Sequence, residues 1–346
     1  MTTRFSLRSF AFPRLALATM VLAAALLAAC GGGGGGGSTS TSSGTTYVTA
    51  AAPGELVTYT VDTTALTYSY TITESQYGLT GTTGSGTLTS LGNHAYSLSG
   101  IANSRIVTLP NGFMMGAIRH DFNDGNGVKT YPVVGMTNPT STLAGLAGTY
   151  NFISRGCITG SGCTTKYGTI RINNDATWNY CPSVNVASGS PACGATSMGS
   201  VSSLGSGKYA LAVSGTTVGT VLAMTSGGQT VLMVDLKDTS TGGSSLGKGF
   251  IVASTQTAVN TTQTDGTWFA HGSSGYTAVF TTSGNAVHYS QVNGSAANTN
   301  ATVTLDNPWT GMALSPTSTP VMLAGQGVYV NANTANGYIE VGLKYN

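Results

Sequence analysis

The sequence predicts an all-β protein built from antiparallel meanders, and three observations support this fold class. Charged residues make up only 7% of the 346 residues, whereas a soluble domain carries roughly 25%, and the scarce types are those that fill exposed helix positions. Gly, Thr and Ser together account for 141 residues. Apolar and polar residues alternate as in half-buried strands, for example over residues 66–73 and 338–345. An α-rich enzyme, a coiled coil and a basic nucleic-acid binder are therefore disfavoured.

The first 29 residues have the composition of a signal peptide. Arg4, Arg8 and Arg14 give the segment a positive start, and residues 15–27 form an apolar run that is interrupted only by Thr19. Spanning a bilayer takes about 20 apolar residues. A shorter run of this kind is typical of the core of a signal peptide rather than of a transmembrane helix.

A cysteine stands at the end of this segment, in the sequence Leu27-Ala28-Ala29-Cys30. The four residues resemble the lipobox of bacterial lipoproteins. The resemblance implies that Cys30 becomes the mature N-terminus and carries a diacylglycerol and an acyl chain, which together anchor a protein to a membrane. It also implies the outer membrane, with the body facing the periplasm or the cell surface, because Gly31 stands where an Asp often marks retention at the inner membrane. The alternative is a plain signal peptide followed by an incidental cysteine.

Residues 30–46 are expected to form a flexible tether between the lipid and the body. Seven consecutive glycines, 31–37, are followed by Ser and Thr, and chains of this composition behave as flexible coils. Removal of the three signal-peptide arginines leaves ten Lys and Arg against eleven Asp and Glu, a net charge of −1. Such a body has no electrostatic footprint for nucleic acid. It also has no basic patch for lipid headgroups, so the expected membrane contact is the lipid on Cys30.

The body repeats itself. Residues 86–98 align without gaps to residues 199–211, with six identities in 13 positions, and residues 67–70 parallel residues 177–180. The repeats predict three meander modules of about seven short strands each, barrel-like or sandwich-like, at residues 47–143, 146–258 and 265–346.

A second echo opens two of these modules, where Gly148-Thr149-Tyr150 is repeated as Gly266-Thr267-Trp268. A Gly-x-aromatic opening followed by a meander resembles the calycin-type barrels of the lipocalin and avidin families, and this three-residue motif implies no binding site. A β-propeller is the alternative architecture, although an offset of about 113 residues between echoes exceeds the 40–50 residues of a blade. The run Val231-Leu232-Met233-Val234 is apolar on both faces and is expected to be covered on both sides.

Four further cysteines, Cys157, Cys163, Cys181 and Cys193, lie within 37 residues. Clustered cysteines of even number outside the cytoplasm are typical of disulfides. The favoured pairing is the local one, Cys157–Cys163 with Cys181–Cys193, because both intervals have the composition of loops. A four-cysteine zinc site is the alternative, but the usual ligand spacing is C-x₂₋₄-C. Neither a metal nor another cofactor is predicted.

No catalytic residue is predicted either. Residues 243–247 match G-x-S-x-G and residues 245–248 match S-x-x-K, but a chain so rich in Gly and Ser contains about one match to each by chance. The first motif also requires a strand-to-helix turn, and the second a helix. Residues 121–127 depart from a calcium loop, because Gly125 occupies a ligand position. The histidines are widely separated in sequence, at His94, His120, His271 and His288.

The leading functional hypothesis is a non-enzymatic outer-membrane lipoprotein with a structural or binding role in the cell envelope. Its basis is the scarcity of charge, which makes paired acid–base groups hard to assemble; the sequence identifies no protein or glycan partner. A second hypothesis is a carrier that holds a small apolar or glycan ligand in a barrel-like module, lined by residues such as Tyr68, Tyr70, Trp178 and Tyr180. A third is a hydrolase, in which a histidine and an acid from distant segments converge on a hydroxyl group.

Overall fold

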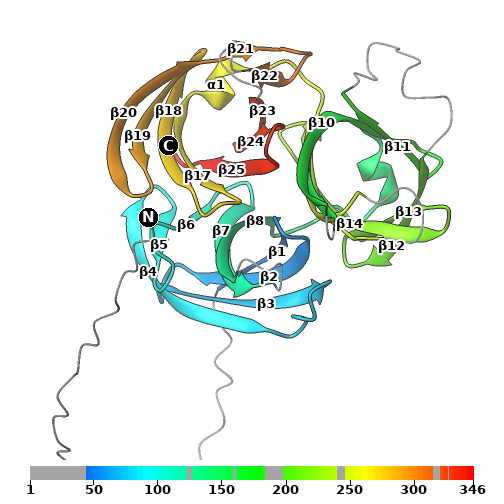
Figure 1. The fold of residues 1–346 in the computed structure, drawn as a ribbon, viewed down its shortest axis with the longest axis horizontal. Helices are drawn as coiled ribbons and strands as arrows, with labels where there is room; N and C mark the ends of the chain where they lie inside the picture. The colour runs from blue at the N-terminus through cyan, green and yellow to red at the C-terminus, as the bar shows by residue number, and fades with distance from the viewer. Residues whose placement is uncertain are drawn as a thin grey trace, which may run out of the picture. The chain divides into compact units, whose positions relative to one another are not determined.

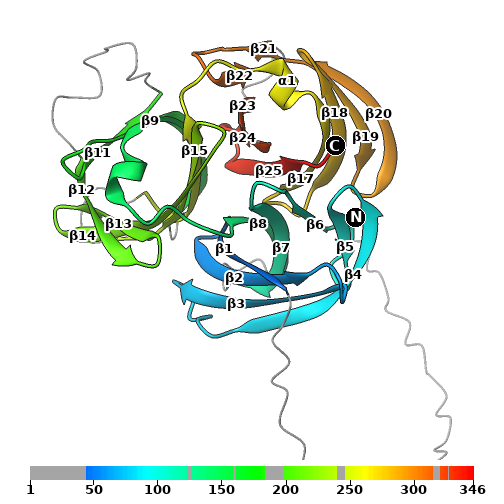
Figure 2. The same ribbon diagram turned by 180° about the vertical axis from the view of Figure 1, so that it is seen from behind.

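The computed structural model describes residues 44–122, 127–158, 161–183, 198–239, 246–314, 320–325 and 327–346. They belong to one compact unit and confirm the all-β prediction, because three antiparallel sheets follow one another along the chain (Figures 1 and 2). The two helices in these ranges, η1 (Leu143–Leu146) and α1 (Thr261–Thr264), have four residues each. No helix of the described residues is long and apolar enough to cross a membrane.

The first sheet is a closed barrel, here called barrel 1, because its last strand pairs with its first. Each strand also pairs with its neighbour in sequence, so barrel 1 is an up-and-down meander. It begins at Thr45, two residues before the expected module start. Its strands are β1 (Thr45–Ala51), β2 (Glu55–Asp62), β3 (Thr67–Ser75), β4 (Thr83–Gly92), β5 (Ala95–Leu98), β6 (Arg105–Thr108), β7 (Phe113–Asp121) and β8 (Val128–Met136).

The second sheet, barrel 2, repeats this arrangement and closes through pairing of its last strand with its first. The helix η1 directly precedes it. Its strands are β9 (Gly148–Ile158), β10 (Gly162–Ile172), β11 (Thr177–Pro182), β12 (Gly199–Gly205), β13 (Lys208–Val213), β14 (Thr216–Ser226), β15 (Gln229–Leu236) and β16 (Lys248–Thr255).

The third sheet, sheet 3, also pairs its first strand with its last, and α1 precedes it. Its two ends in the strand order, β20 and β21, are consecutive in the chain and separated only by Val303, so the sheet curls into a nearly closed barrel. Its strands are β17 (Gly266–Gly272), β18 (Thr277–Ser283), β19 (Ala286–Val292), β20 (Ser295–Thr302), β21 (Thr304–Leu305), β22 (Met312–Leu314), β23 (Pro320–Gly325), β24 (Val328–Asn333) and β25 (Tyr338–Lys344).

The barrel form of the meanders is thus confirmed, and the propeller alternative is wrong. Propeller blades are separate four-stranded sheets, whereas here eight consecutive strands close on one another twice. The sheets have eight, eight and nine strands rather than about seven.

The sequence echoes fall on equivalent strands of barrels 1 and 2. Residues 86–98 lie on β4 and β5 and residues 199–211 on β12 and β13, the fourth and fifth strands of each barrel. The echo has a packing reason. Tyr68 pairs with Gly86, and Trp178 pairs with Gly199; a Cβ atom on either glycine would lie within 3.0 Å of the ring opposite. Glycine therefore gives each cross-strand ring the space it occupies.

The aromatic residues of the two Gly-x-aromatic openings also occupy equivalent places. The Tyr150 hydroxyl donates a hydrogen bond to the carbonyl of Leu146, at 2.7 Å, and Trp268 Nε1 donates to the carbonyl of Thr264, at 3.0 Å. Each bond ties the first strand of a sheet to the last residue of the short helix before it.

The apolar core of barrel 1 continues into the space between the three sheets. In β15, Leu232 and Val234 belong to the core of barrel 2, whereas Val231 and Met233 belong to the cluster shared with barrel 1 and sheet 3. All four side chains are buried, which confirms that this run is covered on both faces. The three sheets share part of their core, and the division into modules at residues 47–143, 146–258 and 265–346 stays a prediction.

Candidate functional site

The predicted disulfide between Cys157 and Cys163 is present and joins partner residues on β9 and β10. The zinc alternative is therefore wrong, since two of its ligands are bonded to each other. Cys181 is also disulfide-bonded, while Cys193 lies outside the described residues, so the second pairing stays a prediction. Cys30 and the rest of the lipobox lie outside them as well. Within the described ranges, no group of three or more His, Cys, Asp or Glu could hold a metal ion.

The aromatic residues of barrel 1 pack against one another. Tyr59 lies between Tyr68 and Tyr70, with ring centroids 6.0 and 5.3 Å apart, and its hydroxyl donates to the carbonyl of Ala117 at 2.6 Å. The Tyr70 hydroxyl lies 2.7 Å from Nε2 of His120. The three tyrosine rings are part of the core of barrel 1.

In barrel 2, aromatic rings likewise pack into the core. Tyr180 stacks on Phe152 with centroids 4.6 Å apart, and Trp178 is fully buried in a different core from Tyr68 and Tyr70. The carrier hypothesis named Tyr68, Tyr70, Trp178 and Tyr180 as the lining of a barrel-like module; the structure buries the first two in the core of barrel 1 and Trp178 in that of barrel 2, with Tyr180 packed against the latter. Inside sheet 3, a cavity beside Trp268 measures only about 30 Å³.

The histidines lie apart, and one of them meets a serine. Ser104 Oγ lies 3.3 Å from Nε2 of His271, whose Nδ1 lies 3.0 Å from the carbonyl of Gly272. A carbonyl can only accept, so Nδ1 carries the proton and Nε2 accepts from the serine. Burial lowers the pKa of His271 to about 4. A catalytic triad has a carboxylate where this histidine has a backbone carbonyl.

The G-x-S-x-G and S-x-x-K motifs lie partly outside the described residues, since Ser244 and Ser245 are not among them. Lys248, the last residue of the second motif, opens the strand β16. A strand therefore follows both motifs, where each of them needs a helix.

An open pocket lies where barrel 1 meets sheet 3, and residues of β5 and β6 contribute to its lining. Its volume is about 300 Å³, at the lower end of the range for small-molecule sites. Barrel 1 contributes the apolar side chains of Leu91 and Ile101, and sheet 3 contributes Phe269 and Val279. We call this space the seam pocket.

Arg105, the first residue of β6, is the one charged side chain among the described residues that line the seam pocket. Its guanidinium donates to Oε1 of Gln291 at 2.9 Å and to the Tyr345 hydroxyl at 3.4 Å, and lies 5.1 Å from the ring centroid of Phe269. Each of these partners is neutral. Tyr345 also lines a second, more open pocket of about 570 Å³.

Acidic residues meet where barrel 1 packs on barrel 2. Glu55 is fully buried and accepts hydrogen bonds from the Ser75 hydroxyl and from the backbone N–H of Gln76. Burial raises the pKa of Glu55 to about 7 and that of Asp235 well above its usual value. Glu74 behaves differently. Burial acts to raise its pKa, but two lysines, Lys237 and Lys208, each 3.0 Å away, outweigh burial and lower it.

A further buried acid, Glu340 on β25, lies inside sheet 3. It accepts a hydrogen bond from the Tyr338 hydroxyl at 2.7 Å, and burial raises its pKa to about 7. Its other oxygen, Oε1, has no hydrogen-bond partner among the described residues.

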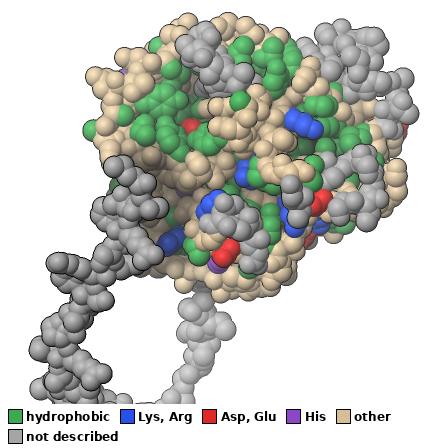
Figure 3. All heavy atoms as spheres, viewed as in Figure 1, with side chains coloured by type: hydrophobic (Ala, Val, Ile, Leu, Met, Phe, Trp, Pro, Cys, Tyr) green, Lys and Arg blue, Asp and Glu red, His purple; other side chains and the backbone are tan. Residues whose placement is uncertain are grey.

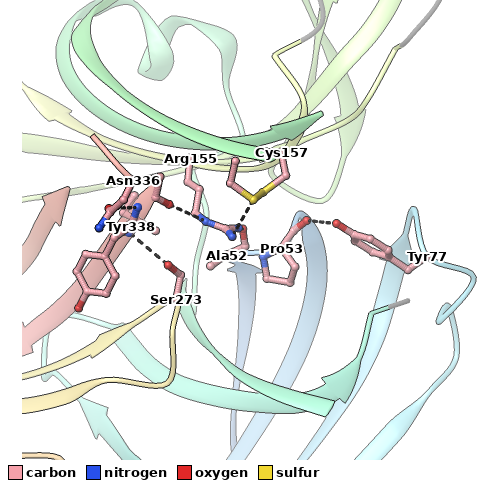
Figure 4. The surroundings of a disulfide bond; sticks show 11 residues. Ala52, Pro53, Tyr77, Arg155, Cys157, Ser273, Asn336 and Tyr338 are labelled. Carbon is pink, nitrogen blue, oxygen red and sulfur yellow. Dashed lines mark hydrogen bonds between the residues drawn. A yellow bond between two sulfur atoms is a disulfide. The ribbon is translucent and has the colours of Figure 1, made fainter. Parts of the chain in front are cut away.

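Arg155 on β9 connects all three sheets beside the disulfide (Figure 4). Its Nε donates to the carbonyl of Gly337 in sheet 3 at 3.1 Å, and Nη1 donates to the carbonyl of Ala52 in barrel 1 at 3.4 Å. Nη2 lies 3.0 Å from Sγ of Cys163. Because only 9% of Arg155 is exposed, these bonds form in a largely water-free junction.

Sequence reasoning missed Arg105 and Arg155, which donate hydrogen bonds between sheets, and the buried acids Glu55 and Asp235. A signal was available for Asp235, because an acid directly follows the doubly apolar run of β15. On the face shown in Figure 3, charged side chains are few and the two signs are mixed. In a chain so poor in charge, a charged residue inside an apolar strand indicates a special environment.

Comparisons with known proteins identify no family. No protein-family model matches the chain, and no curated protein matches it. Among solved structures, two mutants of the vaccine antigen transferrin binding protein B from Haemophilus parasuis Hp5 are similar at 11% and 10% identity. Each match covers 84% of this chain but less than two thirds of the other, 66% and 65%, with a TM-score of 0.23. At this TM-score, the similarity indicates neither a shared fold nor a shared function.

Proposed function

We propose that the chain is a non-enzymatic binding lipoprotein of the outer membrane, and that its binding site is the seam pocket rather than the inside of a barrel. The observation that carries the proposal is the contrast between the two kinds of space. The described aromatic rings of the two barrels are packed into their cores, whereas the seam pocket is open and contains a guanidinium with neutral partners.

The proposed anchor is the lipid on Cys30. It is supported by Leu27-Ala28-Ala29-Cys30 and by the tether of glycines that follows. Several acyl chains together hold a protein to a membrane almost permanently, so the body needs no membrane-binding surface of its own. Its mixed and sparse charges agree with such an arrangement (Figure 3).

Replacing Cys30 with Ser is expected to move the protein from the outer membrane into the soluble or unprocessed fraction, because the thioether to diacylglycerol requires the sulfur. Membrane fractionation with an antibody against the body measures this. Gly31→Asp is the matched variant, which should stay lipidated but shift to the inner membrane. A Cys30→Ser protein that is still processed and membrane-bound would refute the anchor.

Replacing Ser97 with Trp is expected to abolish ligand binding at the seam. Ser97 lines the seam pocket and is the cross-strand partner of Arg105, so an indole at this position fills the space beside the guanidinium. Native mass spectrometry of the wild-type lipoprotein, purified under mild conditions, should show a small molecule that the variant lacks. Equal occupancy of the two proteins, or a wild type that never carries a ligand, contradicts binding at the seam.

A further inference from the structure

We propose that the seam pocket takes a small ligand with a carboxylate group on a compact apolar body. This inference rests on the proposed binding role and specifies its chemistry. Four features of the described residues carry it: the charge of the pocket, the direction of its hydrogen bonds, the exposed apolar wall, and its volume.

The charge of the pocket is positive and uncompensated. No Asp or Glu is among the described residues that line it, and the hydrogen-bond partners of Arg105 are an amide oxygen and a phenol. A guanidinium is always protonated in proteins, and holding it partly out of water is costly unless an anion pairs with it. A ligand that brings the missing negative charge therefore binds with a more favourable free energy than a neutral ligand of the same shape.

The hydrogen-bond geometry selects a carboxylate among anions of this size. A guanidinium presents several N–H donors in a planar fork, which matches the two oxygens of a carboxylate. Gln291 and Tyr345 occupy donors on the two terminal nitrogens of Arg105, and the remaining N–H groups are available. The hydroxyl of Ser97, on the neighbouring strand opposite Arg105, can donate to the same carboxylate.

The rest of the pocket is apolar, and part of it is exposed. Leu91 lines the pocket and is 48% exposed, which is unusual for a large apolar side chain here. Together with Ile101 and Phe269 it forms a wall against which an apolar group can pack. Leu204 occupies the equivalent hairpin of barrel 2 with similar exposure, 52%, but does not line this pocket.

The volume sets the size of the ligand. A water molecule takes about 30 Å³ in the liquid, so about 300 Å³ holds roughly ten non-hydrogen atoms. Phenylacetate has this size and carries a carboxylate on a flat apolar ring. Phenylacetamide has the same shape without the charge, and is therefore the matched control ligand.

The test is a calorimetric titration of the purified, lipidated protein with phenylacetate and phenylacetamide. The wild type should bind phenylacetate saturably and phenylacetamide at least about tenfold more weakly, as expected for a charge-assisted hydrogen-bond pair. Arg105→Gln should weaken phenylacetate binding by about tenfold or more, and Arg105→Lys by less, because a lysine keeps the charge but loses the fork. Leu91→Ala should weaken it by about threefold to tenfold.

Two control variants separate local effects from general ones. Arg119→Gln removes an exposed arginine of the same barrel, and Leu204→Ala removes the equivalent exposed leucine; both should stay within about twofold of the wild type. Thermal unfolding checks that each variant is folded. Equal binding of the two ligands, equal effects of Arg105→Gln and Arg119→Gln, or no saturable binding at about 10 mM phenylacetate overturns the inference. If the wild type still carries another ligand that Ser97→Trp loses, the proposed function stands without this ligand class.

Discussion

Replacing Arg155 with Ala is expected to lower the free energy of unfolding by about 3 kcal/mol. The change removes donors from the carbonyls of Gly337 and Ala52, and a buried acceptor without a partner costs roughly 1–3 kcal/mol. It also leaves a cavity where the side chain stem had packed. Urea unfolding followed by tryptophan fluorescence measures the loss, because Trp178 and Trp268 are buried in barrel 2 and sheet 3.

Two further variants show which part of Arg155 matters. Arg155→Met restores most of the packing but no hydrogen-bond donor. Its free energy of unfolding should therefore remain at least about 1 kcal/mol below that of the wild type. Arg171→Ala removes an exposed arginine from the same barrel and should change stability by less than about 0.5 kcal/mol. If Arg155→Met is as stable as the wild type, the hydrogen bonds that Arg155 makes between sheets make no net contribution to the free energy of unfolding.

Stability is expected to fall as the pH rises from about 4.5 to 7 and to level off above that. The pKa values of Glu55 and Glu340 are raised to about 7 by burial, whereas in the unfolded chain both groups ionise near 4.5. Above pH 4.5 the folded state therefore holds protons that the unfolded state has released, and stability is lost as the pH rises through 7. His271 acts in the opposite direction below pH 6.5, because its folded-state pKa is lowered.

The variant Glu340→Gln isolates one of these groups. A shift from 4.5 to about 7 corresponds to about 3 kcal/mol, so the variant should be more stable than the wild type by about this amount at pH 8 and equal to it near pH 4.5. Glu74→Gln is the control with opposite sign, because lysines lower the pKa of Glu74 and the variant should lose stability at pH 8. Urea titrations at several pH values measure both; parallel curves for Glu340→Gln and the wild type would exclude ionisation of Glu340 as a cause.

The fold class was predictable because its signals are local. Alternation along a strand, glycines opposite aromatic rings and the short interval between Cys157 and Cys163 are all properties of neighbouring residues or of one hairpin. The repeats identified equivalent strands, since the pairing of Tyr68 with Gly86 recurs as Trp178 with Gly199. The number of strands was harder to predict, because polar strands such as β20 show no clear alternation of apolar and polar residues.

The candidate site was not predictable in the same way, because it depends on contacts between sheets. Arg105 and Gln291 are 186 positions apart, and nothing in either strand's sequence indicates that the two strands meet. The aromatic residues pointed to the barrel interiors instead, where the structure packs their rings against one another. A cavity is the volume that side chains leave over, and residue types alone do not determine it.

The shared core has a consequence for the order in which the protein is made. Barrel 1 is complete at Met136, yet its outward apolar face is covered by residues as late as Leu343. At about 5–20 residues per second, the covering strands follow roughly 10–40 s later. During that interval, a folded first barrel exposes an apolar surface that its own chain does not yet cover. The shared core therefore favours folding after the last strand has emerged over domain-by-domain folding during synthesis.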